Sequence, residues 1–228
     1  MNIPTTYIDK LGCIEGYTQL VNNYHNLSIF KGQFISTFIL KIAEAEFISE
    51  ALDQFQRFNG GSKERLIVDG YNRLLNCTLI FHLPITVSKN DIDQQTILDL
   101  EITIGTEEDP MNYKISSQRL TLENYSVQNK NGIVETGFND LKNALPNNIK
   151  LKCCFNCAYS GFSLYSSGFF GCIICYRNAK IEFLNIKSKD DYVEISEKGV
   201  DKYMETHLCD EFEYRIAKTG YGMFQEEE

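Results

Sequence analysis

Two cysteine pairs in the last third of the sequence constrain this chain more than any other feature. Cys154 and Cys157 form a C-x-x-C pair, and Cys172 and Cys175 form a second pair after fourteen intervening residues. Two such pairs at this separation are close to the zinc-ribbon pattern. Zinc accepts four thiolates in a tetrahedron, and a C-x-x-C turn places two sulfurs on one side of the ion. The spacing therefore predicts a structural zinc site that contributes folding free energy.

The chain has more candidate thiols than the four that one zinc ion needs. Cys153 can replace Cys154, and either Cys172 or Cys209 can complete the set with Cys175. If Cys172 and Cys175 lie on one continuous strand, their side chains point to opposite faces and only one of them can bind. We therefore favour a set of four ligands: Cys154, Cys157, Cys175 and Cys209. The alternative is that these cysteines are small buried side chains of a core without metal.

The cellular compartment follows from the cysteines and from the N-terminal residues. The chain has eight cysteines in 228 residues, and residues 1–10 contain no apolar segment of a secretory signal. This combination predicts free or metal-bound thiols in a reducing cytoplasm instead of a disulfide framework. The longest apolar stretches are far shorter than the roughly 20 residues of a membrane helix, so we expect no membrane association.

The middle of the chain has the alternation typical of antiparallel strands. Apolar residues alternate with polar ones over residues 98–104 and over residues 75–81, where Pro84 is expected to close the strand. Residues 120–127 suggest one further strand, and Asn131-Gly132 is a tight-turn signal. Residues 34–42 are rich in β-branched and aromatic side chains, which favours a strand, although their spacing also fits a helix.

Helices are expected on either side of this sheet. Apolar residues recur at helical spacing over residues 46–58, and Asn59-Gly60-Gly61 follows as a stop signal. Thr136 can cap a short helix that Pro146 ends. Beyond a strand over residues 149–154 and a short returning strand over 172–176, residues 177–187 and 192–214 look mostly helical.

Together these patterns predict an α+β protein with an antiparallel sheet, flanking helices and a C-terminal cysteine-rich metal knuckle. We expect residues 1–148 to form a β-rich body with an N-terminal helix. Residues 149–228 are expected to form a cysteine-cluster region with C-terminal helices that shares one core with the body.

Acidic residues are concentrated at the C-terminal end of the chain. The net charge is −9, and residues 190–228 contain twelve acids against four bases. An acidic surface attracts basic partners and repels phosphate backbones, although many such surfaces only keep a protein in solution. The residues that we predict to bind a protein partner are Asp190, Asp191, Glu194, Asp210 and Glu211.

The sequence offers two alternatives to protein binding. Four bases interleaved with aromatic residues could serve a zinc-ribbon-like nucleic-acid-binding or regulatory protein: Lys150, Lys152, Arg177 and Lys180. The neighbouring acids oppose that interpretation. An enzyme with a cysteine nucleophile needs a group that stabilises the thiolate, and only His207 is close in sequence. Because no nucleotide-binding, metalloprotease or hydrolase motif occurs either, we predict that the chain is not an enzyme.

Three segments resemble an uncharacterised bacterial domain family. They are KCCFNCAYS at residues 152–160, FFGCIICYRN at 169–178 and LCDEFEYR at 208–215. Its members share a C-x-x-C-x-Y-S loop, a G-x-x-x-C-[FY]-R segment and a later L-C-x-E-F. The resemblance is specific over residues 149–215 and vaguer over the body from about residue 75. Where the family pattern continues with Asp, this chain has Gly161, which argues against a polar function of the loop.

The resemblance adds an expectation about function. Members are similar to small stand-alone proteins found beside secreted polymorphic toxins, which implies an immunity role. It also implies Cys154, Cys157, Cys175 and Cys209 as the recurring cysteines. The expected protein is therefore a binding module that neutralises a toxin by covering a basic active site. The sequence does not indicate its oligomeric state.

Overall fold

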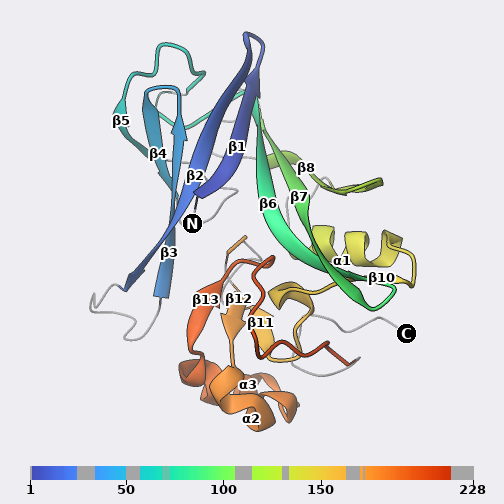
Figure 1. The fold of residues 1–228 in the computed structure, drawn as a ribbon. Helices are drawn as coiled ribbons and strands as arrows, with labels where there is room; N and C mark the ends of the chain where they lie inside the picture. Colours follow the sequence, from blue (N-terminus) through green and yellow to red (C-terminus); the bar gives the residue numbers. More distant parts are fainter. Residues whose placement is uncertain are drawn as a thin grey trace. The chain divides into compact units, whose positions relative to one another are not determined.

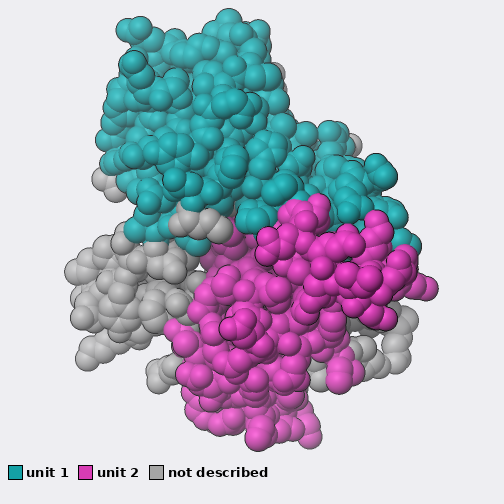
Figure 2. Space-filling view, in the orientation of Figure 1, with its two compact units in different colours: residues 1–23, 35–84, 97–146 teal, residues 24–34, 85–96, 147–228 magenta. Residues whose placement is uncertain are grey.

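The computed structural model describes most of the chain, as two compact units. The described residues are 2–24, 34–49, 57–68, 70, 72–105, 115–129, 134–162, 170–171 and 173–216. Unit 1 consists of residues 1–23, 35–84 and 97–146, and unit 2 consists of residues 24–34, 85–96 and 147–228 (Figure 2). Within the described residues, no helix is long and apolar enough to cross a membrane.

A large antiparallel β-sheet dominates the fold, with few and short helices (Figure 1). Its strands follow the order β5-β4-β3-β2-β1-β6-β7-β8-β9, and β10 pairs with β6. Their bounds are β1 Asn2–Asp9, β2 Gly12–Tyr24, β3 Phe34–Ile42, β4 Ala45–Ser49, β5 Arg57–Gly61, β6 Cys77–Lys89, β7 Ile92–Ile104, β8 Ile115–Leu122, β9 Tyr125–Asn129 and β10 Ile149–Leu151. The predicted antiparallel sheet is confirmed, and the protein is α+β with mostly β-structure.

Alternating burial explains why these residues form strands. On β7, Leu98, Leu100, Ile102 and Ile104 are buried, and the polar residues between them are only partly buried. On β6 the same alternation runs from Cys77 to Ile85. Each of these strands therefore has one apolar face, and the buried side chains on these faces form part of the core.

Two strands extend differently from what the sequence predicted. β6 continues through Pro84 to Lys89. On this strand, β1 pairs with residues up to Phe81, and β10 pairs with residues from Val87 onward. Pro84 falls between these paired segments, where its missing N–H removes no ladder bond to either strand. Residues 120–127 belong to two strands, β8 and β9, which are joined by a turn at Glu123 with φ of 52°.

The helix predicted over residues 46–58 is wrong for the part that the structure describes. Residues 46–49 belong to β4, and residues 57 and 58 belong to β5. Phe47 and Phe58, which were expected on one helical face, are cross-strand partners with ring centroids 5.6 Å apart. The apolar spacing was therefore that of two strands. The strand predicted over residues 34–42 is confirmed as β3, and the Asn131-Gly132 turn lies outside the described residues.

Helix α1 (Val134–Ala144) confirms the prediction of a short helix before Pro146, although it begins two residues earlier than Thr136. Its buried residues Val134, Phe138 and Leu141 share a face, and the helix packs on β8 and β9. Gly137 lies at the closest approach. A Cβ at this position would be 2.5 Å from Leu120 Cδ1, and 3.0 and 3.1 Å from Gln118 Oε1 and Asn129 Nδ2, which form a buried hydrogen bond.

Replacing Gly137 with alanine should therefore destabilise the protein. Alanine gains about 1 kcal/mol in helix propensity over glycine. Overpacking against Leu120 costs about 1–3 kcal/mol, and disturbing the Gln118–Asn129 bond adds about 1 kcal/mol. We expect a net loss of about 1–3 kcal/mol in urea unfolding. Asn143→Ala, at an exposed position of the same helix, should be neutral or slightly stabilising. A stabilised Gly137→Ala variant would contradict this packing.

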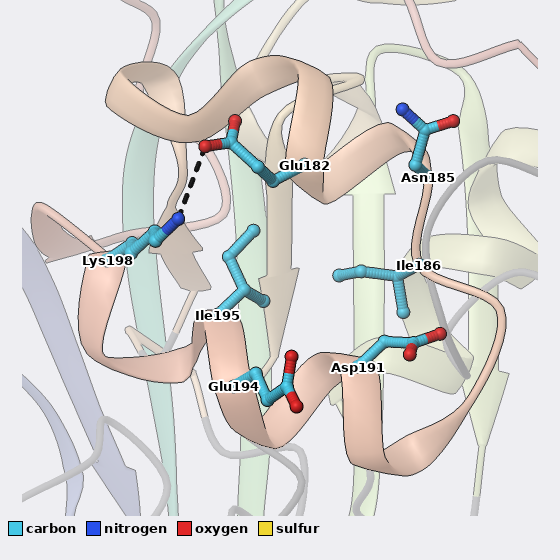
Figure 3. Close-up of a pocket in the computed structure, with 7 residues that line it drawn as sticks. All are labelled: Glu182, Asn185, Ile186, Asp191, Glu194, Ile195 and Lys198. Carbon is cyan, nitrogen blue, oxygen red and sulfur yellow. Dashed lines mark hydrogen bonds and ion pairs between the residues drawn. The ribbon is translucent and has the colours of Figure 1, made fainter.

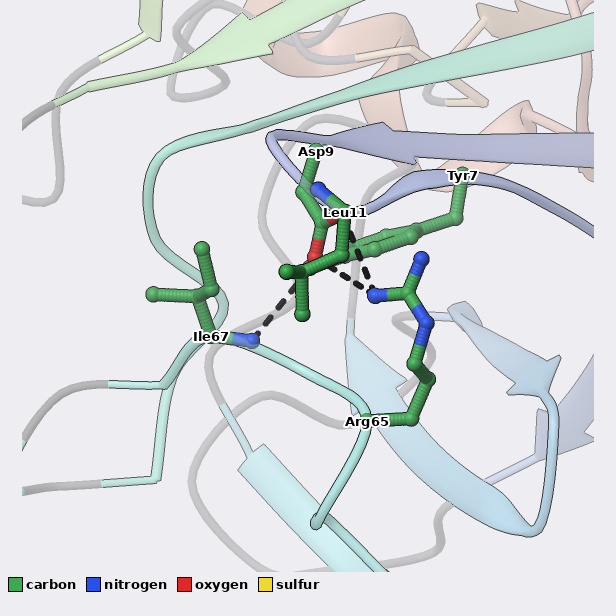
Figure 4. A network of polar contacts seen from close by, with 5 residues as sticks. All are labelled: Tyr7, Asp9, Leu11, Arg65 and Ile67. Atoms are coloured by element: carbon green, nitrogen blue, oxygen red, sulfur yellow. Dashed lines mark hydrogen bonds and ion pairs between the residues drawn. The ribbon is translucent and has the colours of Figure 1, made fainter.

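A partly buried polar network joins the β1–β2 hairpin to the segment before β6 (Figure 4). The Asp9 carboxylate accepts hydrogen bonds from Arg65 Nη1 at 2.9 and 3.1 Å, from the Leu11 N–H at 2.8 Å and from the Tyr7 hydroxyl at 3.1 Å. The Ile67 N–H donates to the Tyr7 oxygen at 3.3 Å. The Asp9 side chain is inaccessible to solvent, so these bonds replace its hydration.

Unit 2 contains a second, three-stranded sheet and the remaining helices. Strands β11 (Ser160–Phe162), β12 (Ile173–Cys175) and β13 (Asp201–Tyr203) pair in that order, and α2 (Lys180–Leu184) and α3 (Lys189–Ile195) follow β12 in the chain. The returning strand near Cys175 is confirmed. The helix predicted over residues 192–214 ends at Ile195 and, after the 3₁₀ helix η3 (Ser196–Lys198), gives way to β13 and irregular chain. The buried residues of this core are Tyr176, Ala179, Phe183, Ile186, Tyr192 and Ile195.

Candidate functional site in the cysteine-rich unit

The first cysteine group lies in a tight turn that follows β10. Residues Cys154–Asn156 form a 3₁₀ helix, η1, and the Cys157 N–H donates to the Cys154 carbonyl at 3.1 Å. The Ser160 hydroxyl donates to the Cys154 and Cys157 carbonyls, which closes the turn from the other side. Cys153, Cys154 and Cys157 are all buried. The predicted C-x-x-C turn therefore exists, and it is packed inside unit 2.

The other two predicted ligands come from β12 and from the C-terminal segment. Cys175 is the last residue of β12, opposite Ser160 of β11. Cys209 lies in a segment that runs back along the turn, where the Cys154 N–H donates to the His207 carbonyl at 2.6 Å and the Ala158 N–H to the Glu213 carbonyl at 2.8 Å. This return path carries Cys209 to the turn. Cys172, the alternative ligand, lies outside the described residues.

The four thiols lie close enough to influence one another. Burial raises the pKa of Cys154 strongly, and the neighbouring thiols of Cys157, Cys153, Cys175 and Cys209 raise it further. Burial also raises the pKa of Cys157, with a contribution from Cys175 and Cys209, while the N–H groups of Tyr159 and Glu213 act in the opposite direction. All four cysteines that the sequence singled out therefore belong to unit 2, and Cys154 interacts electrostatically with the other three.

Cys153 has different surroundings from Cys154. Burial raises the pKa of Cys153 to about 12, with smaller contributions from the Glu205 carboxyl group and the Cys157 thiol. Cys154, in contrast, interacts with every other described thiol of this unit. Of the two adjacent cysteines, Cys154 is therefore the better candidate to bind a metal ion together with the other thiols.

The arrangement does not form a metal site as it stands. Among residues that the structure describes, no group of three or more His, Cys, Asp or Glu side chains is arranged to hold a metal ion. The donor chemistry of four soft thiols fits zinc, but the described side chains are not arranged as a coordination shell. The predicted metal knuckle is therefore not found as a metal-binding cluster among the described residues.

Sequence reasoning missed a cation beside this cluster. Burial by itself would lower the pKa of Arg177, but the Cys175 sulfur that its guanidinium contacts, together with Tyr203 and Cys209, raises it. Arg177 Nη2 also donates to the Tyr203 hydroxyl, and the Tyr203 ring stacks on His207 with centroids 4.5 Å apart. His207 itself lies on irregular chain and not on the helix predicted over residues 192–214. The C-Y-R spacing at residues 175–177 was the only sequence signal for this contact.

A buried carboxyl group, that of Glu205, lies within the acidic run. Glu205 is fully buried, and its carboxylate accepts a hydrogen bond from the Gly171 N–H at 2.8 Å. Glu205 also interacts with the Cys153 thiol. The sequence had assigned the whole acidic run to the surface, and nothing in the local pattern distinguished this residue from its neighbours.

The predicted partner-binding carboxylates are all exposed on unit 2. Asp190, Asp191 and Glu194 lie on α3, and Asp210 and Glu211 lie in the C-terminal segment. Asp191 also completes a capping box with Ser188, which holds the start of α3. Glu211 pairs with Lys180 at 3.1 Å. We call these five carboxylates the acidic face.

A shallow pocket of about 440 Å³ opens beside α2 and α3 (Figure 3). Two isoleucines of the unit 2 core, Ile186 and Ile195, contribute apolar surface to it. Its other lining residues are Glu182, Asn185, Asp191, Glu194 and Lys198. Two members of the acidic face therefore line a concave surface.

The bases of the nucleic-acid interpretation are engaged with other groups. Lys152 pairs with Asp93, and Lys180 pairs with Glu211 and lies 4.6 Å from the Tyr159 ring centroid. Arg177 is directed to Tyr203 and Cys175. Lys150 is exposed and lies over the Tyr214 ring. Three of the four bases thus have partners that compete with phosphate.

Comparison with known proteins places the chain in a family. The model of a family of unknown function, DUF6304, matches residues 1–160. The chain belongs to this family. The match spans the sheet and the turn with Cys153, Cys154 and Cys157, whereas Cys175 and Cys209 lie beyond it. It therefore covers mainly the part of the chain where the resemblance noted in the sequence was vaguer. No curated protein and no solved structure matches the chain.

Gly161, where the resembled pattern has Asp, lies against aromatic side chains. A Cβ at this position would be 3.2 Å from both Phe183 Cζ and the Tyr192 hydroxyl. An aspartate would place a carboxylate next to the Phe183 ring in the core of unit 2. The glycine in this chain therefore serves close packing of β11.

Proposed function

We propose that this protein is a non-enzymatic binding protein whose acidic face recognises a basic protein partner. The observation that carries the proposal is the exposure of all five carboxylates on one unit. A surface of one sign steers an oppositely charged partner and raises the association rate, while apolar or aromatic anchors supply most of the affinity.

The specific form of the proposal is an immunity protein that blocks the basic active site of a toxin. Its support is the resemblance of residues 149–215 to proteins found beside polymorphic toxins. A blocking protein needs an acidic, pre-organised surface and no reacting groups of its own. The capping box of α3 and the Glu211–Lys180 pair fix part of that surface in place.

The alternative of a zinc-ribbon-like nucleic-acid-binding or regulatory protein has weaker support. Non-specific affinity for nucleic acid comes mainly from bases that neutralise phosphates. Here Lys152 and Lys180 are neutralised by carboxylates of the same unit. Acids on the same surface add repulsion, so we rank this alternative second.

A cysteine nucleophile is the third alternative. Arg177 supplies the thiolate stabiliser that the sequence did not reveal, and it acts on Cys175. Cys175 is only 6% exposed, however, and burial raises the pKa of the neighbouring Cys153, Cys154 and Cys157 thiols. Reactive thiols are accessible and have a depressed pKa, so this cluster has the character of a structural site.

The proposal includes a structural zinc ion held by Cys154, Cys157, Cys175 and Cys209. Its support is the C-x-x-C turn, the electrostatic interaction of Cys154 with the other three thiols, and the Arg177 guanidinium at Cys175, which can offset the charge of bound thiolates. Because the described side chains are not arranged as a metal site, binding requires the four thiols to move together around the ion. We expect about one zinc per chain by elemental analysis of protein purified without chelator.

Cysteine variants test the zinc site. Cys157→Ser should lose the zinc, and Cys13→Ser, at an exposed position in unit 1, should retain it. A protein free of zinc, whose buried thiols all react with a thiol reagent after unfolding, would instead establish a thiol cluster without metal.

The binding proposal is tested by affinity capture from the native host followed by reconstitution with the purified partner. We expect a basic protein that binds stoichiometrically and whose affinity falls as the salt concentration rises. Capture of nucleic acid, or of no partner at all, contradicts the proposal.

A further inference from the structure

The pocket beside α2 and α3 combines an apolar wall with an excess of carboxylates. Ile186 and Ile195 are buried and belong to the unit 2 core, so the apolar wall is anchored in a packed structure. Three carboxylates (Glu182, Asp191 and Glu194) and one ammonium (Lys198) line the pocket, and the ammonium lies next to Glu182 (Figure 3). The pocket is therefore both apolar and negatively charged.

The three carboxylates differ in their engagement. Glu182 accepts a hydrogen bond from Lys198 Nζ at 3.2 Å. Asp191 accepts hydrogen bonds from the N–H groups of Lys187 and Ser188, both at 2.9 Å. Glu194 has no hydrogen bond or ion pair to any residue whose side chain the structure describes, and its carboxylate is the one we assign to a ligand.

We infer that this pocket receives an arginine side chain of the protein partner. The inference rests on the proposed function and names its anchor. An arginine has a guanidinium that can pair with the Glu194 carboxylate, and an aliphatic stem that can contact the small parts of Ile186 and Ile195 that remain exposed, 9% and 4%. The volume of about 440 Å³ lies within the usual range for ligand pockets, so a side chain of this size can enter.

Apolar side chains on the same two helices provide further contact surface. Ile181 is 75% exposed and Val193 is 42% exposed, on α2 and α3 respectively. An interface typically combines a few apolar or arginine anchors with a polar rim. The α2–α3 region has these components next to each other in the sequence and on one unit.

The first test uses small probes and needs no identified partner. N-acetyl-arginine amide is titrated into isotopically labelled protein at constant ionic strength, with the neutral citrulline analogue as the matched probe. We expect millimolar binding with amide shifts centred on Glu182, Asn185, Glu194 and Lys198, and at least fivefold weaker binding of the citrulline analogue. Equal binding of the two probes, shifts elsewhere or no saturable shift overturns the inference.

Paired variants make the test specific to the pocket. Glu194→Gln and Asp210→Asn each remove one exposed negative charge from unit 2, but only Glu194 lines the pocket. We expect Glu194→Gln to weaken arginine amide about three- to fivefold, the scale of an exposed ion pair, and Asp210→Asn to change it less than 1.5-fold. Equal losses indicate general screening and overturn the inference.

The captured partner separates this inference from the proposed function. If the partner binds and both variants weaken it equally, the binding function stands and the arginine pocket does not. If no protein partner binds while arginine amide still occupies the pocket, the pocket stands as an arginine site and the proposed function fails.

Discussion

Replacing Gly16 with alanine should destabilise the protein by about 3 kcal/mol. Gly16 lies on β2 opposite Thr5 of β1, and a Cβ built on it would be 2.2 Å from the Lys41 carbonyl oxygen and 3.3 Å from Ile42 Cα. Both atoms belong to the backbone of β3, which cannot rotate away as a side chain can. Overpacking usually costs about 1–3 kcal/mol, and a backbone clash belongs at the upper end.

Gly60→Ala is the matched control for this experiment. Gly60 lies on β5, and a Cβ there would meet no atom within 4 Å. We expect a change within about 0.5 kcal/mol, because surface substitutions away from special features have little effect. The chain has no Trp, so urea unfolding is best followed by far-ultraviolet circular dichroism. Equal stability of the two variants would show that β2 and β3 separate at no cost.

Strands with one apolar face were predictable from the sequence. Leu98, Leu100, Ile102 and Ile104 alternate with polar residues, and all four are buried on β7. Local alternation is sufficient here because the strand is long and successive side chains point to opposite faces of the sheet. The helix before Pro146 was predictable for the same reason, since Phe138 and Leu141 share a buried face.

The hairpins with unusual turns were not predictable. β3 and β4 are joined at Ala43-Glu44, where Ala43 has φ of 53°, and β8 and β9 are joined at Glu123, where φ is 52°. Such turns usually contain Gly, Asn or Asp at positive φ, so Ala and Glu gave no turn signal. Phe47 and Phe58, which the apolar spacing assigned to one helix, meet across two strands.

The cysteine cluster shows the same division between local and non-local information. The spacing of Cys154 and Cys157 indicated a turn, which the structure contains. The return of Cys209 to that turn depends on backbone bonds such as Cys154 N–H to the His207 carbonyl, which no local pattern encodes. The buried Glu205 was missed because composition describes a segment as a whole and does not separate one residue from its neighbours.

Asp9→Asn should destabilise the protein by about 2–3 kcal/mol at pH 7. The substitution leaves Arg65 without its anion and weakens the hydrogen bonds from the Tyr7 hydroxyl and the Leu11 N–H. Loss of one partner of a buried ion pair costs about 3–5 kcal/mol, and the estimate is lower here because the Arg65 side chain is 33% exposed. Asp93→Asn, which removes an exposed pair with Lys152, should cost less than about 1 kcal/mol.

The pH dependence of this loss identifies its origin. Burial would raise the pKa of Asp9, but the hydrogen bonds from Arg65, the Leu11 N–H and Tyr7 outweigh it and lower the pKa below that of an unfolded aspartate, about 3.9. The unfolded state therefore binds the proton more readily, and the stabilisation by Asp9 is fully present above about pH 5. It is lost as the pH falls through the folded value. The difference in unfolding free energy between wild type and Asp9→Asn should thus be constant from pH 7 to pH 5 and shrink below pH 4. A difference that stays the same at pH 3 would show that the charge of Asp9 is not what stabilises the hairpin.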